Sequence, residues 1–238
     1  MELAIDTSTN TAGIALSEQG RIMSEMTWDT GQNHTVELIP KLVTLLEQQE
    51  IAITDINEIV VAKGPGSFNG LRVGLATAKG LAFALGIGMV CISTLEAIAF
   101  AHADIDLPVY PILQAGRGEI ATAIFSNQSG KWTSHLAEYV TTIKGLCSSI
   151  KEQSIICGEI TIEQQRSLNK ELGNRAFFPQ ESSDSGRAGY LAKLGWCRIE
   201  AGDFDDPSTI QPLYLKKPSI TKPQRRKNDA LSNMRAGI

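Results

Sequence analysis

The feature that most constrains the fold of this chain is a glycine-rich segment at residues 64–74, GPGSFNGLRVG, which follows an apolar run at residues 59–62. The proline restricts φ, the glycines permit positive φ, and Ser67 or Asn69 can cap the first free N–H groups of a helix. The segment therefore predicts a buried strand, a tight turn and a helix over residues 70–85.

A glycine-rich turn before a helix is a candidate phosphate site, because the helix N-terminus presents unpaired N–H groups and a positive dipole end. The segment matches neither nucleotide motif, however. It has no Gly-Lys-Ser/Thr triplet at the P-loop spacing, and a dinucleotide fingerprint would need glycine where Asn69 stands. We therefore interpret the turn first as a capped connection between a strand and a helix.

Composition narrows the class of protein. A chain of 238 residues with 42% hydrophobic residues is long enough for one large domain or two small lobes, and its net charge of −4 gives no bulk reason to bind nucleic acid. The segment at residues 80–93 is too short to span a membrane, and the N-terminus lacks a basic signal region, so we expect a cytoplasmic protein. The cysteines are far apart, and we expect reduced thiols at Cys91, Cys147, Cys157 and Cys197.

Hydrophobic periodicity predicts the same arrangement twice along the chain, an antiparallel meander of three strands followed by helices. The two meanders are predicted at residues 3–5, 12–16 and 21–28, and at 109–113, 120–126 and 131–139. Further helices are predicted at 33–49, 94–102, 161–172 and 184–201, and further strands at 89–93, near Ile155 and near Ala176. We expect a first lobe at 1–104, a second, smaller lobe at 105–215, and a mobile basic tail at 216–238 that is solvated or touches RNA or an acidic partner.

Few residues are candidates for chemistry. Asp6 ends the first strand, where it either binds a metal or phosphate or forms a turn. His34 precedes a helix, and a capping or surface role is favoured over a ligand role. Arg117 and Glu119 lie in a predicted turn between two strands. They either have a functional role or form a salt bridge within the loop. The chain has no His-Glu-x-x-His and no Gly-x-Ser-x-Gly motif.

The helix at 70–85 is apolar on nearly all sides, with only Arg72 and Lys79 marking a polar edge. Such a helix is either buried within its own fold or partly covered by another molecule. Small residues at intervals of four, from Gly70 to Ala78, leave room for a neighbouring backbone. We favour contact with a partner as the reason for part of this surface.

Several segments together resemble the TsaB (YeaZ) family: IDTST at residues 5–9, residues 34–40, the glycine-rich segment 64–74, and PLYL at 212–215. The resemblance implies an α/β protein with the two-lobed actin-like ATPase fold (ASKHA, ribonuclease H-like), each lobe a mixed sheet flanked by helices. It also implies the non-catalytic subunit of the bacterial machinery that makes N6-threonylcarbamoyladenosine at position 37 of tRNA.

The catalytic relative in that machinery, TsaD, carries a metal-binding His-x-x-x-His pair where this chain has Thr94 and Ile98, and neither residue replaces imidazole as a ligand. Glycine-rich runs that approach adenosine and phosphate are also missing from the second lobe. We therefore expect no catalytic, cofactor-binding or metal-binding residues. Asn69 replaces the family's threonine, and the turn at 114–119 departs from the family pattern, so we assign that turn no role.

By the same resemblance, we expect the helices at 33–49 and 70–85 to bind a TsaD-like catalytic subunit. The expected interface residues are Leu38, Leu42, Leu45, Arg72, Ala76, Lys79 and Phe83. A TsaE-like ATPase is a further expected partner, the chain alone is either a homodimer or a monomer, and tRNA is reached indirectly through the complex. The alternatives are an actin-like-fold enzyme, a kinase or a metallopeptidase-like protein with its own nucleotide or metal site, and an unrelated α/β binding module.

Overall fold

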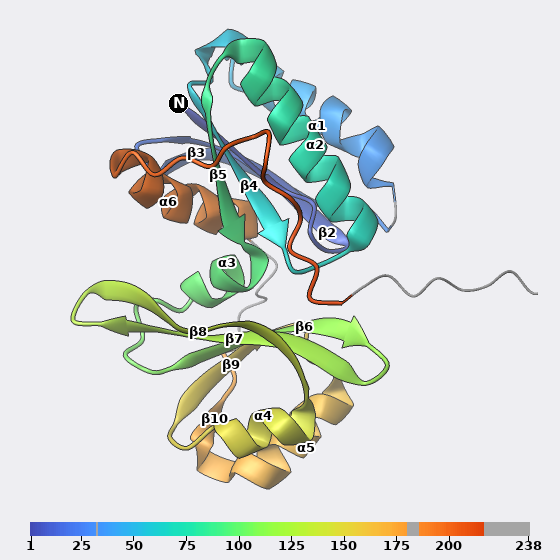
Figure 1. The fold of residues 1–238 in the computed structure, drawn as a ribbon, viewed down its shortest axis with the longest axis vertical. Helices are drawn as coiled ribbons and strands as arrows, with labels where there is room; N and C mark the ends of the chain where they lie inside the picture. Colours follow the sequence, from blue (N-terminus) through green and yellow to red (C-terminus); the bar gives the residue numbers. More distant parts are fainter. Residues whose placement is uncertain (32, 180–185, 217–238) are drawn as a thin grey trace, which may run out of the picture.

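The computed structural model describes residues 1–31, 33–179 and 186–216, which form two five-stranded sheets of the same topology (Figure 1). In each sheet three consecutive strands form an antiparallel meander, and two later strands add in parallel beside its first strand. The strand orders are β3-β2-β1-β4-β5 and β8-β7-β6-β9-β10. Both predicted meanders and the two-lobed mixed-sheet class are thereby confirmed.

The first sheet contains β1 (Glu2–Asp6), β2 (Thr11–Glu18), β3 (Arg21–Asp29), β4 (Glu58–Gly64) and β5 (Gly88–Ser93). Side chains alternate across it, so Leu3 and Ile5 point to one face and Ala4 to the other. The helices α1 (His34–Gln48) and α2 (Phe68–Leu85) cover the face of Leu3, and α6 (Arg187–Glu200) covers the face of Ala4. A short 3-10 helix, Ile53–Asp55, precedes β4.

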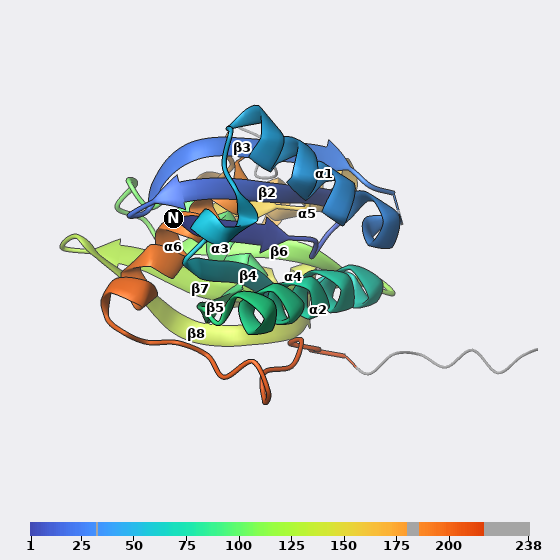
Figure 2. The ribbon, with the colours of Figure 1, turned by 90° about the horizontal axis from the view of Figure 1, so that it is seen from above.

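The second sheet contains β6 (Val109–Gly116), β7 (Glu119–Gln128), β8 (Lys131–Thr142), β9 (Ser154–Gly158) and β10 (Ala176–Phe177). The helices α4 (Ile143–Ser149) and α5 (Ile162–Leu172) cover its outer face, and a 3-10 helix, Gly173–Arg175, precedes β10. The remaining helix, α3 (Thr94–Phe100), lies between the two sheets (Figures 1 and 2). Its Leu95 and Ile98 pack on the second sheet, while its Ala97 packs with the first.

After α6, residues 201–216 form an extended segment that runs back along the first lobe to the junction of the lobes, and we call it the C-terminal strap (Figure 2). Asp205 N–H donates to Met89 O over 2.9 Å, and Leu213 N–H donates to Lys63 O over 2.7 Å. Both α6 and the strap therefore pack on the first lobe, and the division at residues 104 and 215 stays a prediction. Residues 217–238 of the predicted tail lie outside the described residues.

Two helices differ from the sequence prediction in detail. The structure adds α4, which the periodicity did not predict because its seven residues expose much of their surface and bury only Leu146. The helix predicted at 33–49 is α1, and it contains Pro40 in its interior. Among the described helices, none has both the length and the apolar composition needed to cross a bilayer.

Candidate functional site

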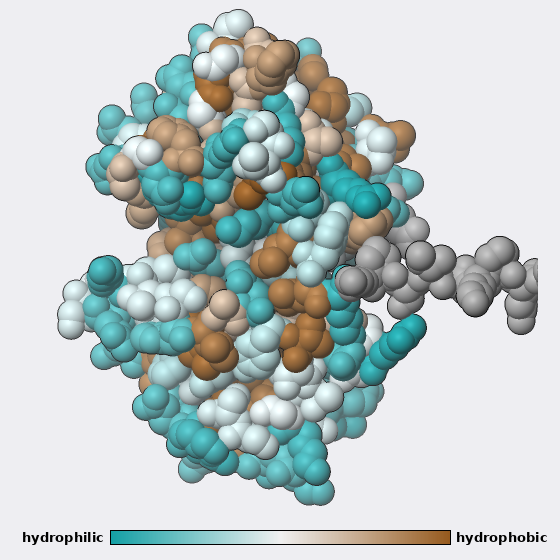
Figure 3. Space-filling model, viewed as in Figure 1, coloured by the Kyte–Doolittle hydropathy of each residue, from teal (hydrophilic) through white to brown (hydrophobic). Residues whose placement is uncertain are grey.

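The outer surfaces of α1 and α2 carry exposed apolar side chains, and the two helices pack side by side (Figure 1). Phe83 is 90% exposed on α2, and Val36, Ile39 and Val43 are 68%, 47% and 46% exposed on α1. With exposed Ala76 of α2, these residues define the α1–α2 face. Figure 3 shows hydrophobic patches over these helices, interrupted by polar residues. Contiguous exposed apolar surface is typical of protein-contact sites.

The structure corrects three of the expected interface residues. Leu38, Leu42 and Leu45 are at most 3% exposed and pack in the core beneath α1, because the leucine side of this amphipathic helix faces the sheet. They cannot touch a partner in this conformation. The exposed apolar residues of α1 are instead Val36, Ile39 and Val43. Their spacing of three and four residues, which places them on one flank of the helix beside the leucine side, was the available signal.

The four remaining expected residues lie on α2. Arg72, Ala76 and Phe83 are exposed, and Lys79 is half-buried. Lys79 Nζ donates to Ile210 O of the strap over 2.7 Å, so this lysine fastens the strap to α2. Ala76 and Phe83 thus present exposed side chains on α2, with Phe83 beside Asp206 and Pro207 of the strap, and Lys79 has a partner within the chain.

Arg72 also has partners within the chain. Its guanidinium lies 3.8 Å from the Phe68 ring centroid, and its Nε donates to the Tyr214 hydroxyl over 3.1 Å. Phe68 and Tyr214 are themselves in ring contact, with centroids 4.9 Å apart. This cluster anchors the end of the strap at the start of α2.

The small residues of α2 make room for the chain's own backbone. A Cβ on Gly66 would lie 2.1 Å from Ser8 O, one on Gly70 would lie 2.0 Å from Thr7 O, and one on Gly74 would lie 2.3 Å from Thr7 Oγ1. The loop between β1 and β2 therefore packs directly on the glycine-rich segment. Of the small residues in this helix, Gly80 has open space around it.

The glycine-rich turn forms the capped connection that the sequence predicted. Ser67 is the N-cap of α2, and its hydroxyl accepts a hydrogen bond from Gly70 N–H over 3.3 Å. Ser67 N–H in turn donates to Ser8 O over 2.6 Å. The N–H groups of Ser67 and Gly70 are therefore already paired within the chain. A phosphate bound at this helix start would need free N–H donors.

Asp6 at the end of β1 is fully engaged by the chain. One carboxylate oxygen accepts from Ser8 N–H over 2.8 Å and from the Ser8 hydroxyl over 2.6 Å, which is the predicted turn geometry. The other oxygen pairs with the guanidinium of Arg187 from α6. Arg187 also donates to Thr9 Oγ1 over 2.8 Å and to Thr11 O over 2.7 Å. Both charged residues are at most 3% exposed, so the carboxylate is neutralised inside the protein.

His34 is buried, in contrast to the expected capping or surface position. Its Nε2 lies 2.8 Å from Thr9 O and 3.1 Å from the Thr30 hydroxyl. The imidazole therefore ties the start of α1 to the loop after β1 and has a structural role.

Thr94 and Ile98, which the resemblance set against the metal-binding histidines of TsaD, are both fully buried at α3 between the sheets. Within the described ranges, no group of three or more His, Cys, Asp or Glu side chains has the geometry of a metal site. The four cysteines are free thiols, as expected. Burial raises the pKa of Cys91 to about 12, which makes this thiol a poor nucleophile.

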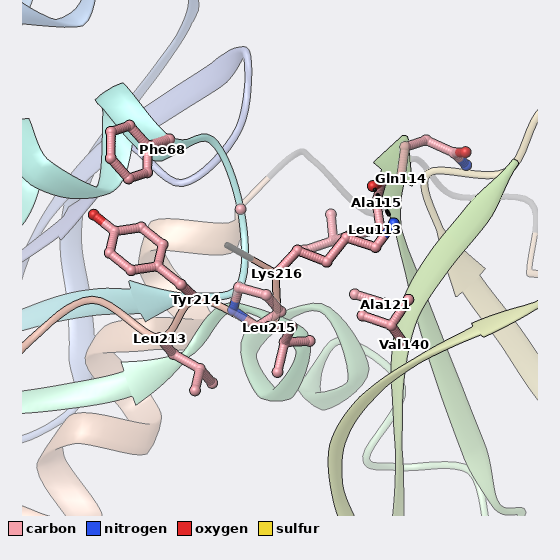
Figure 4. A pocket seen from close by; sticks show the side chains of 12 residues that line it. Phe68, Leu113, Gln114, Ala115, Ala121, Val140, Leu213, Tyr214, Leu215 and Lys216 are labelled. Carbon is pink, nitrogen blue, oxygen red and sulfur yellow. Dashed lines mark hydrogen bonds between the residues drawn. The ribbon is translucent and has the colours of Figure 1, made fainter. Parts of the chain in front are cut away.

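A cavity of about 280 Å³ lies at the junction of the lobes, between the glycine-rich turn, the second sheet and the end of the strap (Figure 4). Its wall is largely apolar, with Leu113 and Val140 on one side and Tyr214 and Leu215 on the other. Lys216 crosses it, donating to Ala115 O over 3.0 Å and pairing with Glu119. Glu119 therefore forms a salt bridge to the strap, across the mouth of this cavity, and both interpretations of the Arg117 and Glu119 pair stay predictions.

Comparisons with known proteins give one consistent likeness. Residues 27–179 match the family described as TsaD, tRNA N6-adenosine threonylcarbamoyltransferase. The chain is 32% identical over 217 residues to the tRNA threonylcarbamoyladenosine biosynthesis protein TsaB of Bacillus subtilis, covering 90% of this chain and 93% of that protein. It is 28% identical to the TsaB protein of Escherichia coli over 171 residues, covering 71% and 68% of the two chains.

Solved structures support the fold. YeaZ from Pseudomonas aeruginosa superposes with a TM-score of 0.74 at 23% identity, covering 90% of this chain and 99% of that one. A ROK family protein from Streptococcus pneumoniae superposes with a TM-score of 0.50 at 10% identity, covering 84% and 99%. The actin-like fold expected from the sequence is thus confirmed.

Proposed function

The chain belongs to the TsaB (YeaZ) family and takes part in the biosynthesis of threonylcarbamoyladenosine in tRNA. From that membership we propose that it is a non-catalytic subunit, which pairs through the α1–α2 face with a TsaD-like catalytic subunit that modifies adenosine 37. The pairing stabilises the active assembly. The α1–α2 face is the single observation that carries this proposal.

The face has the composition of an interface centre. Phe83 presents almost its whole ring to solvent, and Ile39 and Val43 of the neighbouring helix are about half exposed. Aromatic side chains that become buried in a complex carry a large share of its binding free energy, with exposed apolar neighbours excluding water around them. Residues 27–179, which include α1 and α2, match the TsaD family, and this likeness supports a partner that offers a similar pair of helices.

Three observations support a non-catalytic role. The Asp6 carboxylate, which sits where a metal or phosphate ligand was considered, is neutralised by Arg187. Thr94 and Ile98 occupy the positions of the metal-binding histidines of TsaD, and both are buried. The start of α2 pairs with Ser8 and with its own cap. The Asp6 carboxylate and the N–H groups of Ser67 and Gly70 are therefore already paired within the chain, which supports a role without a ligand at these places.

The further partners follow from family membership. A TsaE-like ATPase joins the pair, two copies of this chain pair through the α1–α2 face when the catalytic subunit is absent, and tRNA is bound by the complex rather than by this chain alone. We place the protein in the cytoplasm, where tRNA is modified.

The test compares single substitutions on two exposed helices. Phe83→Glu and Ala76→Glu place a charge on the α1–α2 face, and each should weaken binding to the TsaD-like subunit by about tenfold or more in calorimetry. Ile162→Glu is the matched control, because Ile162 is 65% exposed at the start of α5 on the second lobe. Undiminished binding by both face variants would remove the basis for this interface.

The enzyme alternative predicts different results. A kinase or metallopeptidase-like protein should bind ATP tightly as the isolated chain, or retain a metal after purification. We expect neither for this chain, and calorimetry with ATP together with metal analysis of the purified protein distinguishes the two functions.

A further inference from the structure

The last described residues of the C-terminal strap, 213–216, contact both lobes, and we call them the strap end. Its first two residues bind the first lobe. Leu213 N–H donates to Lys63 O of β4 over 2.7 Å, and the Tyr214 ring contacts Phe68 of α2 with 4.9 Å between the ring centroids. The strap end is therefore attached to the strand and the helix on either side of the glycine-rich turn.

The next two residues of the strap end bind the second lobe. Leu215 packs against the apolar cluster that includes Leu113 of the second sheet. Lys216 Nζ donates to Ala115 O over 3.0 Å and pairs with the Glu119 carboxylate. The contacts of the strap thus pass from one lobe to the other between two consecutive residues.

The strap end is an additional connection between the lobes. The chain itself passes between them twice, from α3 to β6 and from β10 back to α6. Figure 1 shows the end of the strap between the two lobes, above β6. Unlike the two passages of the chain, the contacts of the strap end can break and re-form without a change in covalent structure.

The cavity of about 280 Å³ at the junction shows why this connection matters. It separates Phe68 of the first lobe from Ala121 and Val140 of the second, and the side chains of Tyr214 and Leu215 lie between them (Figure 4). The two lobes therefore do not pack directly on each other here, and the strap end determines the width of the junction on this side.

The contacts on the second lobe are weak enough to be reversible. The side chains of Lys216 and Glu119 are 37% and 39% exposed, so water and salt screen their ion pair. Leu215 is only partly buried. Lobes joined by a small contact area move relative to each other unless something fixes them.

We propose that the strap end is a latch that holds the two lobes in their relative orientation. When Leu215 and Lys216 leave the second lobe, the lobes move apart about α3, and the junction cavity opens into a cleft. The latch residues differ from Ala76 and Phe83 of the α1–α2 face, so the latch can be tested without any partner.

The first experiment measures access to the cavity. Ala121→Cys places a thiol on its second-lobe wall, where Ala121 is 3% exposed, in a chain that also carries Cys147→Ser and Cys197→Ser. A thiol-alkylating reagent should label this position slowly while the latch is intact. The combined variant Leu215→Ser/Lys216→Ala should accelerate labelling by about tenfold or more, because local opening becomes less costly.

Matched controls separate local opening from unfolding. Cys91 is 1% exposed in the first sheet, and its labelling rate in the same chain should not change. Glu119→Gln breaks the ion pair without altering the strap and should accelerate labelling of the cavity position by about twofold. Lys170→Ala removes an exposed lysine of α5 and should have no effect.

The second experiment measures the distance between the lobes. Nitroxide labels at Asn69→Cys on α2 and Lys144→Cys on α4, both exposed positions, report that distance by double electron–electron resonance in the same background without accessible thiols. The chain with an intact latch should give one narrow distance distribution. The combined variant should give a broader distribution shifted to longer distances.

The proposal stands only if both the labelling rate and the distance increase in the folded combined variant. Faster labelling at an unchanged distance would mean that the strap end merely covers the cavity wall, and it would overturn the latch. A broad distance distribution in the chain with an intact strap end would overturn it as well, because the lobes would then move freely with the contacts in place.

Discussion

Arg187 and Asp6 form a buried ion pair although they are 181 residues apart in the chain. The arginine begins α6, and the aspartate ends β1 at the centre of the first sheet. Each group has further hydrogen bonds, from Ser8 to the carboxylate and from the guanidinium to Thr9 and Thr11. A buried pair that is completed in this way holds both charges without leaving either unpaired.

Removing one member of this pair should destabilise the protein strongly. Arg187→Met leaves a buried carboxylate without its counter-charge and should lower the free energy of unfolding in urea by about 3–5 kcal/mol. Adding Asp6→Asn should recover part of this loss, because the second substitution removes the unpaired charge. The comparison variant is Asp203→Asn, which breaks the exposed pair with Arg198 and should change stability little. Equal effects of Arg187→Met and Asp203→Asn would contradict a buried, neutralised site.

Two glycines of α2 should respond in opposite directions to alanine. A Cβ on Gly70 would meet Thr7 O at 2.0 Å, so Gly70→Ala should lower the free energy of unfolding by about 3 kcal/mol or more. Gly80 has nothing within 4 Å of the added atom, so Gly80→Ala should raise it by about 1 kcal/mol through helix propensity. Thermal unfolding of the two variants measures both changes, and a stabilising Gly70→Ala would show that the loop does not pack on this helix as described.

Glu96 should make stability depend on pH. Burial, and secondarily the charge of Glu138, raises the pKa of the Glu96 carboxyl above its ordinary value of 4.5. The folded state therefore favours the protonated acid, and stability is lost as the pH rises from 4.5 through the raised pKa. Glu96→Gln should remove this loss, by about 1.4 kcal/mol for each unit of pKa elevation.

Urea unfolding of Glu96→Gln and of the unchanged chain across this pH range tests that expectation. The difference between them should be near zero at acidic pH and should grow to a plateau at neutral pH. Glu47→Gln serves as the control, because Glu47 is an exposed acid on α1. A Glu96→Gln difference that stays constant with pH would argue against a shifted carboxyl.

The cysteines should differ in reactivity toward a thiol-alkylating reagent. Cys197 is exposed and should react first, and Cys147 is partly buried and should follow. Cys91 and Cys157 are buried, and burial raises the pKa of both thiols, so they should react only when the protein unfolds. Peptide mapping by mass spectrometry during a time course gives the order, and early labelling of Cys157 in folded protein would contradict its place in the core.

Much of the fold could be predicted from the sequence because its signals are local. The alternation of Leu3, Ala4 and Ile5 and the matching patterns of the later strands identify both meanders. A capped helix after the glycine turn was predicted from residue 70 with Ser67 or Asn69 as the cap, and α2 begins at Phe68 with Ser67 as its N-cap. The seven-residue α4 was not predicted, because it buries a single leucine and so has little periodicity.

The candidate site was harder to predict, since its features depend on distant contacts. The leucines of α1 were predicted to be interface residues. A hydrophobic stripe on a helix has the same sequence pattern whether it packs on a sheet of its own fold or on a partner. Gly70 and Gly74 were predicted to leave room for a neighbouring backbone, but the spacing of small residues does not identify that neighbour as the chain's own loop at Thr7. No local pattern links Arg187 to Asp6, because that contact exists only after α6 has returned to the first sheet.

Because α6 covers one face of the first sheet, the ribosome must synthesise residues 187–200 before that lobe can close. The strands of the second sheet are complete at Phe177. During translation the second lobe can therefore finish folding while the first, although begun earlier, still exposes the Ala4 face of its sheet to chaperones. The first lobe, although synthesised first, therefore completes its packing only after α6 has been made and Arg187 can pair with Asp6.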